Sequence, residues 1–234
     1  MVYPPAPWKN FFFGGFYLRQ TRMAKVEPQF MTALRYLMQA DLQPMCQVLD
    51  ILGRVPWTIN NRVLDTMEYV WSIGGGLGTI PKRYNARAIT PEMISNASFG
   101  EKLKLLKEHQ QNSEAHSLRC SFLLTMKIAQ SFRKCQELYF PHNCDFRGRV
   151  YPITPHLNHM GDDLKRGILN FSDGKRIGKE GLWWLKVHLA NKWGQDKLPL
   201  NERAKFAEDM EEVIHRVAAD PSNNLEWLQA ENPW

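Results

Sequence analysis

The sequence predicts a mainly α-helical protein with small antiparallel β elements. Apolar residues recur at three- and four-residue spacing along several long stretches, which is typical of amphipathic helices. Aromatic and glycine-rich stretches between them favour turns and short strands. With 234 residues, of which 44% are hydrophobic, the chain is long enough for one large domain or parts of two, with a sizeable core.

The first fifty residues predict an irregular segment followed by two helices. Residues 1–28 are rich in Pro, Gly and aromatic residues, and they favour irregular structure with a hairpin through Phe16–Val26. Helices are expected over Pro28–Gln39 and Pro44–Leu52, and Gly53 would end the second one.

A third helix is expected next. Thr58 or Asn60 would cap it, and the run Gly74–Gly76 would end it. Its predicted apolar face consists of Ile59, Val63, Met67, Val70 and Trp71. Residues 74–100 then predict a long loop, because the glycine run precedes no helix start and so acts as a breaker rather than a phosphate-binding loop.

The second half predicts more helix and one short hairpin. Residues 101–138 are expected to be mostly helical, with an apolar stripe of Ala115, Leu118, Phe122, Met126, Ala129 and Phe132. Within Ile168–Ile177, Asp173-Gly174 predicts a hairpin turn. A further helix is expected through Leu182, Leu185, Leu189 and Trp193. One more is expected from near Pro199 to before Pro221, through Phe206, Met210, Val213 and Val217.

The distribution of charge favours a localised face that binds a polyanion. The net charge is +6 and the isoelectric point is about 9.1. Residues 101–200 hold 17 Lys and Arg against 10 Asp and Glu, whereas residues 201–234 hold 3 against 8. A basic middle with an acidic tail is typical of such a face. An ordinary solvated surface with uneven charge fits the same net charge.

Several classes of protein are disfavoured by composition. No apolar run approaches the roughly 20 residues that cross a bilayer, so no membrane partner is expected. The first residues lack the features of a signal or transit peptide, so either the chain needs no address or its true N-terminus is missing. Cys46, Cys120, Cys135 and Cys144 form no Cys-x-x-Cys pair, which favours reduced structural thiols.

Two short clusters raise the question of a metal site. His156 and His159 could bind a metal together with Cys144 or Asp162, but their spacing matches no strong zinc pattern, and histidines with ordinary hydrogen bonds are favoured. Asp162 and Asp163 are adjacent and rarely would point at one centre, so they are interpreted as a helix cap. We predict no metal ligand, and no complete catalytic constellation is found.

The stretch Phe140–Pro152 carries the strongest functional signal. It brings together a carboxylate, two arginines, a glycine and a tyrosine, namely Asp145, Arg147, Gly148, Arg149 and Tyr151. Arginine forks match phosphate oxygens, and glycine lets a ligand approach the backbone. Asp145 is expected to orient one guanidinium, and Tyr151 to offer a stacking surface. The alternative is a structural Asp–Arg pair that braces a turn.

A second basic feature lies on the long predicted helix. Arg119, Lys127 and Lys134 are expected on one stripe, apart from the apolar residues. Such a stripe could follow a nucleic-acid backbone, although basic residues at this spacing more often form an ordinary solvent-exposed helix face.

These residues resemble single-subunit, phage-type DNA-directed RNA polymerases, the mitochondrial (organellar) members most closely. The family's Asp-x-x-Gly-Arg motif matches Asp145–Arg149, although Cys144 stands where Met or Leu is usual. Further collinear blocks are Pro4–Trp8, Trp57–Leu64, Asn112–Arg119, Pro155–His159, Gly161–Leu164, Arg166–Phe171 and Gly174–Asn191. The resemblance covers nearly the whole chain.

The resemblance implies part of a right-hand polymerase fold. Residues 1–100 would be the C-terminal part of the N-terminal domain, with an intercalating hairpin near residues 14–26. Residues 101–135 would form the thumb and residues 136–234 the beginning of the palm. Template and hybrid would contact Asp145, Arg147, Gly148, Arg149, Tyr151 and Arg166. The thumb would contact the backbone through Arg119, Lys127 and Lys134.

The resemblance also implies a nucleotidyltransferase that transcribes the mitochondrial genome in the matrix, or a chloroplast counterpart. Mg²⁺ would be the cofactor of the complete enzyme, and template DNA, nascent RNA, nucleoside triphosphates and mitochondrial transcription factors its partners. The catalytic aspartates of the family would lie beyond Trp234, so we expect a fragment that binds no metal and is inactive alone. The alternatives are a non-catalytic nucleic-acid-binding product and a chloroplast or phage member of the family.

Overall fold

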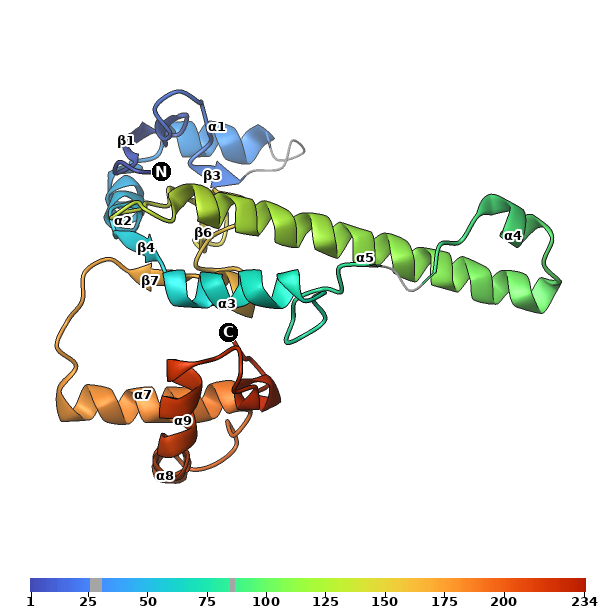
Figure 1. Cartoon of the computed structure of the whole chain (residues 1–234). Helices are drawn as coiled ribbons and strands as arrows, with labels where there is room; N and C mark the ends of the chain where they lie inside the picture. The colour runs from blue at the N-terminus through green and yellow to red at the C-terminus, as the bar shows by residue number, and fades with distance from the viewer. Residues whose placement is uncertain (26–30, 85–86) are drawn as a thin grey trace. The chain divides into compact units, whose positions relative to one another are not determined.

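Helices make up most of the regular structure, and short strands lie between them (Figure 1). The computed structural model describes residues 1–25, 31–84 and 87–234, and it confirms the mainly helical class. The chain divides into two units, residues 1–61 with 128–175 and residues 62–127 with 176–234. None of the described helices is long and apolar enough to span a membrane.

Three small sheets organise the first unit. Their strands are β1 (Ala6–Asn10), β2 (Phe13–Gly15), β3 (Ala24–Lys25), β4 (Trp57–Ile59), β5 (His142–Asp145), β6 (Val150–Pro152) and β7 (Leu169–Phe171). β1 pairs with β2, and β4 with β7, in antiparallel fashion. The third sheet has the order β3–β5–β6, in which β3 runs parallel to β5 and β5 antiparallel to β6. The sequence predicted only antiparallel pairs, so the β3–β5 pair is a correction.

The helices of the first unit agree with the sequence where they are described. They are α1 (Met31–Gln39), α2 (Gln43–Gly53) and α6 (Asp163–Gly167). The predicted start of α1 at Pro28 lies outside the described residues. The predicted cap of α6 is confirmed, because the Asp162 carboxylate accepts a hydrogen bond from the Lys165 amide at 3.1 Å.

The core of the first unit lies between β1, α2 and the three-stranded sheet. Trp8, Met23, Cys46 and Leu49 are buried together. The Trp8 indole donates to the carbonyl of His142 at 3.1 Å, and its backbone amide donates to the Asp50 carboxylate at 2.9 Å. These bonds join β1 to both β5 and α2, so segments that are far apart in the sequence pack together in one core.

Sulfur atoms fill the part of this core that lies against β3 and β5. The Cys46 thiol lies 3.6 Å from the sulfur of Met23, and the Cys144 thiol lies 3.4 Å from that of Met45. Cys144 packs with Phe11 and Ala24. Cys144 therefore serves as an apolar core residue, and the strand keeps its buried side despite the departure from the family pattern.

Glycine is required beside Trp8. Gly14 has φ +156°, and a Cβ there would lie 2.5 Å from the Trp8 ring. Since real side chains do not approach so closely, only glycine lets β2 pack on the indole. The aromatic and glycine-rich N-terminal stretch is thus a hairpin built around one buried tryptophan.

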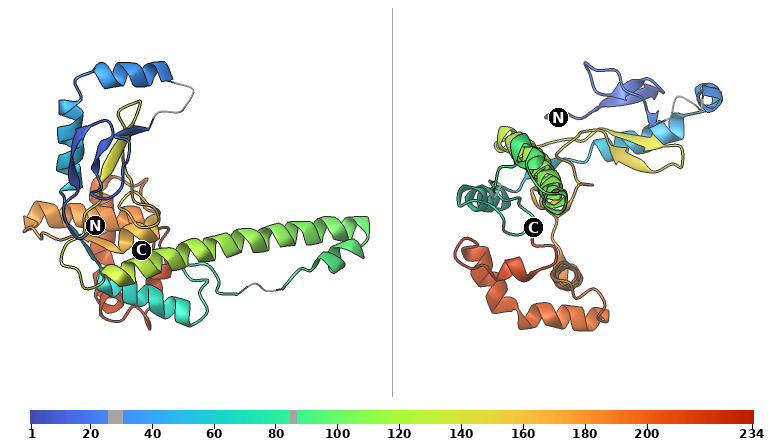
Figure 2. Two further views of the ribbon diagram at one scale, coloured as in Figure 1. Left: turned by 90° about the horizontal axis from the view of Figure 1, so that it is seen from above. Right: turned by 90° about the vertical axis from the view of Figure 1, so that its right-hand side faces the viewer.

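The second unit is helical. Its elements are α3 (Asn61–Ser72), α4 (Pro91–Ser95), α5 (Phe99–Phe132), α7 (Gly178–Trp193), α8 (Leu200–Asp209), α9 (Glu211–Ala219) and η2 (Glu226–Gln229). The last residues of α5, from Ile128, belong to the first unit. Figure 2 shows α4 beside the N-terminal turns of α5. The long loop predicted over 74–100 therefore contains a short helix, which Thr90 caps by accepting from the Met93 amide at 3.4 Å.

Ring packing and polar bonds hold the second unit together. Trp71 of α3 packs on Phe122 of α5 with ring centroids 5.0 Å apart. Lys186 of α7 pairs with Glu208 of α8 at 2.8 Å. The predicted stripe of α5 is buried only at Phe122, Met126 and Ala129, whereas Leu118 is exposed.

Two predicted hairpins are absent from the described residues because their strands pair with distant segments. The hairpin predicted through Phe16–Val26 does not form, since Ala24–Lys25 pairs with β5; the N-terminal hairpin lies at Ala6–Gly15 instead, and Val26 is outside the described residues. No hairpin forms at Asp173-Gly174 in the described chain, because β7 pairs with β4 instead. Ile59 accordingly lies in a strand and not on the helix that follows it.

Two helix boundaries were also wrong. The long helix ends at Phe132 rather than near residue 138, because Arg133 and Cys135 donate to carbonyls three residues back and turn the chain. The helix predicted through Phe206–Val217 is two helices separated at Met210. Neither Gly nor Pro occupies that break, so the usual sequence signal for a helix end is missing.

Met23→Ala tests the sulfur-rich core. Met23 has no exposed surface, whereas Met38 on α1 is 60% exposed. We expect Met23→Ala to lower the free energy of unfolding by about 2–5 kcal/mol, because it leaves a cavity. The matched variant Met38→Ala should change it by less than about 0.5 kcal/mol. Equal losses in urea unfolding of the two variants would contradict this description of the core.

Candidate nucleic-acid interface

The stretch singled out in the sequence folds into a β-hairpin. β5 and β6 pair through His142↔Pro152, Asn143↔Tyr151 and Cys144↔Val150. The Asp145 amide donates to the carbonyl of Arg149 at 2.8 Å, and the Gly148 amide donates to that of Asp145 at 3.1 Å. These bonds close a tight turn, residues 145–149, which we name the arginine turn. It contains all five residues of the Asp-x-x-Gly-Arg motif.

The Asp145 carboxylate holds this turn from within. One oxygen accepts from the backbone amides of Arg147 at 2.8 Å and Arg149 at 2.9 Å. The other accepts from the Tyr151 hydroxyl at 3.3 Å. The expected pairing with a guanidinium is therefore replaced by bonds to the backbone, because the two amides converge on the carboxylate inside the turn.

These bonds also set the protonation of Asp145. Desolvation raises its pKa, but the amides of Arg149 and Arg147, the Tyr151 hydroxyl and the charge of Arg149 outweigh it, so the pKa lies below the usual value. The carboxylate is thus ionised at neutral pH and supplies a lasting acceptor for the turn.

Gly148 is needed for the conformation of the backbone. Its φ is +78°, in the left-handed region that side chains disfavour. A Cβ built there would meet nothing within 4 Å. The turn therefore depends on glycine for its backbone, and a ligand could approach that side without meeting the chain.

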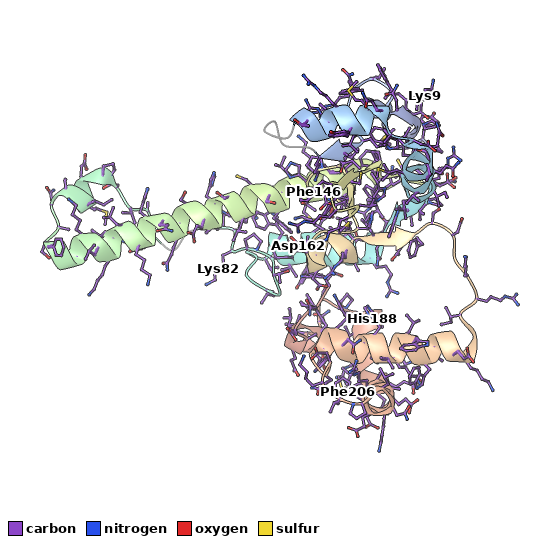
Figure 3. All side chains as sticks on the ribbon, turned by 180° about the vertical axis from the view of Figure 1, so that it is seen from behind. Lys9, Lys82, Phe146, Asp162, His188 and Phe206 are labelled. Carbon is purple, nitrogen blue, oxygen red and sulfur yellow. The ribbon has the colours of Figure 1, made fainter. Side chains whose placement is uncertain are left out.

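The side chains of the arginine turn project outward. Phe146, Arg147 and Arg149 are exposed, and Figure 3 shows Phe146 in this turn. The Arg147 guanidinium lies 5.1 Å from the centre of the Phe146 ring, which is cation–π range. Among the described residues neither guanidinium is within ion-pair distance of a carboxylate. Both charges are available to an anion.

Sequence reasoning missed one cation at this hairpin. Lys25 of β3 is the register partner of Asp145, and its ammonium lies 4.8 Å from the centre of the Tyr151 ring. The ring expected to stack on a base therefore carries a lysine. No signal in the local sequence could have found this contact, because β3 joins β5 only in the folded chain.

The other predicted binding residues lie elsewhere. Arg166 on α6 is 3.9 Å from Asp163 of the same helix, so that helix, and not the arginine turn, holds it. Arg119 and Lys127 lie on α5, whereas Lys134 follows the end of that helix in a turn. The structure thus brings together Asp145, Arg147, Gly148, Arg149 and Tyr151 in one hairpin.

Comparison with known proteins now adds to this geometry. A family model described as DNA-dependent RNA polymerase matches residues 175–234. A mitochondrial DNA-directed RNA polymerase of Neurospora crassa is 40% identical over the whole chain, which spans 17% of that protein. DNA-directed RNA polymerase 1, mitochondrial, of Arabidopsis thaliana is 38% identical over the whole chain. DNA-directed RNA polymerase 3B, chloroplastic, of Nicotiana tabacum is 36% identical over the same extent.

The whole chain is thus similar to organellar DNA-directed RNA polymerases, and its last part matches the family model. It spans a quarter or less of the length of these relatives. The resemblance noted in the sequence is thereby confirmed, and it extends over all 234 residues.

Two histidines, His142 and His159, form a pair that the sequence did not reveal. His159 lies with its Nε2 3.3 Å from the Nε2 of His142, and its ring stacks on Trp57 at 5.0 Å. His156, which was considered with His159, is exposed and has φ +64°. Within the described ranges no three His, Cys, Asp or Glu side chains are placed to hold a metal ion.

Burial keeps the histidine pair neutral. Desolvation and the neighbouring His159 lower the pKa of His142 to about 4, and desolvation also lowers the pKa of His159. Neutral imidazoles can share one N–H···N bond, whereas two protonated rings would repel each other.

Acidification should therefore destabilise the first unit before carboxylates titrate. In the unfolded chain His142 binds a proton near pH 6.5, but in the folded chain only near pH 4. Between these values the unfolded state binds more protons, so stability is complete above pH 6.5 and falls as the pH drops. We expect His142→Phe to flatten the fall measured by urea unfolding from pH 7 to 5. The exposed control His109→Gln should retain it, and an equal fall in all three proteins would contradict the assignment.

Asp145→Ala tests how the arginine turn is held. Removing the carboxylate frees the amides of Arg147 and Arg149, and their hydrogen exchange should become about tenfold faster. Asp145→Asn keeps one side-chain oxygen acceptor and should show a smaller increase. Unchanged exchange in Asp145→Ala would mean that the two backbone bonds across the hairpin suffice to hold the turn.

Proposed function

We propose that this chain is part of a DNA-directed RNA polymerase that transcribes the mitochondrial genome, with a chloroplast polymerase as the alternative. We further propose that its arginine turn grips the template DNA and the RNA–DNA hybrid. The observation that carries the proposal is a hydrogen-bonded turn with two exposed guanidinium groups, neither of which is within ion-pair distance of a carboxylate among the described residues.

Phosphodiesters are the ligands that this turn would suit. Each guanidinium offers a planar fork of donors that matches two phosphate oxygens. Arg147 and Arg149 stand two residues apart, and Asp145 fixes both backbone amides, so little backbone freedom remains to be lost on binding. Exposed Phe146 adds a ring on which a base could stack.

The long helix α5 would add a second contact. In this proposal residues 101–135 are the thumb and residues 136–234 the beginning of the palm, in a partial right-hand polymerase fold. Arg119 and Lys127 of α5, with Lys134 after it, would contact the nucleic-acid backbone without regard to sequence. Such contacts release counterions, so their contribution would fall as salt rises.

The family's magnesium chemistry is not supported by the described side chains. No three His, Cys, Asp or Glu side chains among the described residues come together, so these residues offer no complete set of protein ligands for a metal ion. The proposed role of this chain is grip on the nucleic acid. Nucleotide selection, metal binding and contacts with transcription factors are proposed for the complete polymerase only.

A second candidate is a nucleic-acid-binding product without catalysis, which the same arginine turn supports. Both candidates bind nucleic acid through the arginine turn, but only the first is part of an enzyme that synthesises RNA. We expect the purified 234-residue chain to bind a hybrid and to incorporate no nucleotide. Incorporation that survives removal of contaminating polymerase would contradict both the second candidate and the expectation that this chain is inactive alone.

A salt titration of hybrid binding tests the grip itself. Arg149→Ala should weaken binding of the 234-residue chain to an RNA–DNA hybrid and make the plot of log affinity against log salt shallower by about one. The control is Lys9→Ala, an exposed cation that Figure 3 shows well away from Phe146. Circular dichroism should show both variants folded.

Two outcomes would overturn the proposal. One is a wild-type chain that does not bind the hybrid at low salt. The other is a folded Arg149→Ala variant with the affinity and the salt slope of the wild type, which would leave the cluster a structural brace.

A further inference from the structure

Lys25 stands at the arginine turn although it lies far from it in the sequence. β3 is an edge strand of the sheet β3–β5–β6, and Lys25 is the register partner of Asp145, with which the turn begins. The Lys25 side chain is exposed. A cation from the N-terminal part of the chain thus lies beside the arginine turn.

The alternation of the strands puts Lys25 on the same face as the motif. Side chains in a strand point alternately to opposite faces, and register partners share a face. Ala24 and Cys144, which are partners, are buried in the core. Lys25 and Asp145 therefore point the other way. Tyr151 joins them, because its partner Asn143 lies two residues before Asp145.

Lys25 reaches across the central strand. Its ammonium lies 4.8 Å from the centre of the ring of Tyr151, which belongs to β6 on the far side of β5. Neighbouring strands are about 4.8 Å apart, so the extended lysine stem spans the sheet at the position of Asp145. The Tyr151 hydroxyl in turn donates to Asp145. Lysine, ring and carboxylate form one connected group.

This contact leaves the lysine charge in place. A cation–π contact fixes the direction of an ammonium but does not neutralise it, and the ring covers only one side of a group with three N–H donors. Among the described residues no carboxylate forms an ion pair with Lys25. The ammonium is therefore positioned and still able to bind an anion.

We propose that Lys25 is a third cation of the nucleic-acid site, which binds a backbone phosphate next to those held by Arg147 and Arg149, and that Tyr151 is its positioning residue. This inference rests on the proposed function of the arginine turn. It makes the grip depend on two parts of the chain, so that a segment before α1 and the β5–β6 hairpin hold one strand of nucleic acid together.

Three variants of Lys25 separate charge from packing. Lys25→Met keeps a stem of similar length on the Tyr151 ring and removes the charge, Lys25→Ala removes both, and Lys25→Arg keeps a charge. In salt titrations with an RNA–DNA hybrid, we expect Lys25→Met and Lys25→Ala to weaken binding severalfold and to lower the salt slope by about one. Lys25→Arg should retain the slope, and so should the surface control Lys9→Ala.

Tyr151→Phe and Tyr151→Leu test the positioning role. Phenylalanine keeps the ring under the ammonium and should keep most of the affinity, whereas leucine removes the ring. The leucine variant should weaken binding when Lys25 is present and should have little further effect in the Lys25→Met background. Equal effects of Tyr151→Leu in both backgrounds would remove Tyr151 from the proposal.

The same titrations distinguish failure of this inference from failure of the proposed function. If Arg149→Ala lowers the slope and folded Lys25→Met does not, the arginine turn binds phosphate and Lys25 does not. If neither variant changes the slope, both proposals fall. If Lys25→Met and Lys25→Arg weaken binding equally without a change of slope, Lys25 is a structural brace and the inference is overturned.

Discussion

The pairing of residues 24–25 with residues 144–145 is the constraint on which the rest of the first unit depends. The Cys144 amide donates to the carbonyl of Met23 at 2.9 Å, although the two residues are 121 positions apart. This parallel pair buries Ala24 and Cys144 against the core. Because side chains alternate between the two faces of a strand, the same pairing places Lys25 and Asp145 on the face away from the core. A slip of one residue would exchange these faces and put the carboxylate into the core.

The Asp145 carboxylate shows how a charged cluster can stay open to a ligand. Had it paired with a guanidinium, the turn would have gained an exposed ion pair of small stabilising effect and lost a free cation. It instead binds backbone amides of the very arginines that flank Gly148. The negative charge is used in shaping the turn, so the positive charges are left for a partner.

Local patterns predicted the elements that local forces determine. The proline start and glycine end of α2, the apolar spacing of α7 and the cap of α6 at Asp162 were predicted from neighbouring residues. The motif Asp145–Arg149 was found as a cluster for the same reason. What escaped prediction depends on distant partners. β4 joins β7, β3 joins β5, and His142 meets His159. Lys25 belongs to the site only through such a pairing. The break at Met210 has no local signal, since neither Gly nor Pro marks it.

The sulfur-rich core behind the arginine turn has a consequence for how opening of the sheet can be observed. The Cys144 thiol is buried, and desolvation raises its pKa, so a thiol reagent in solution meets no reactive thiolate while β3 remains paired with β5. Reagent can reach this sulfur only when the core around β3, β5 and α2 opens. The rate at which Cys144 is modified therefore measures how often this part of the core opens.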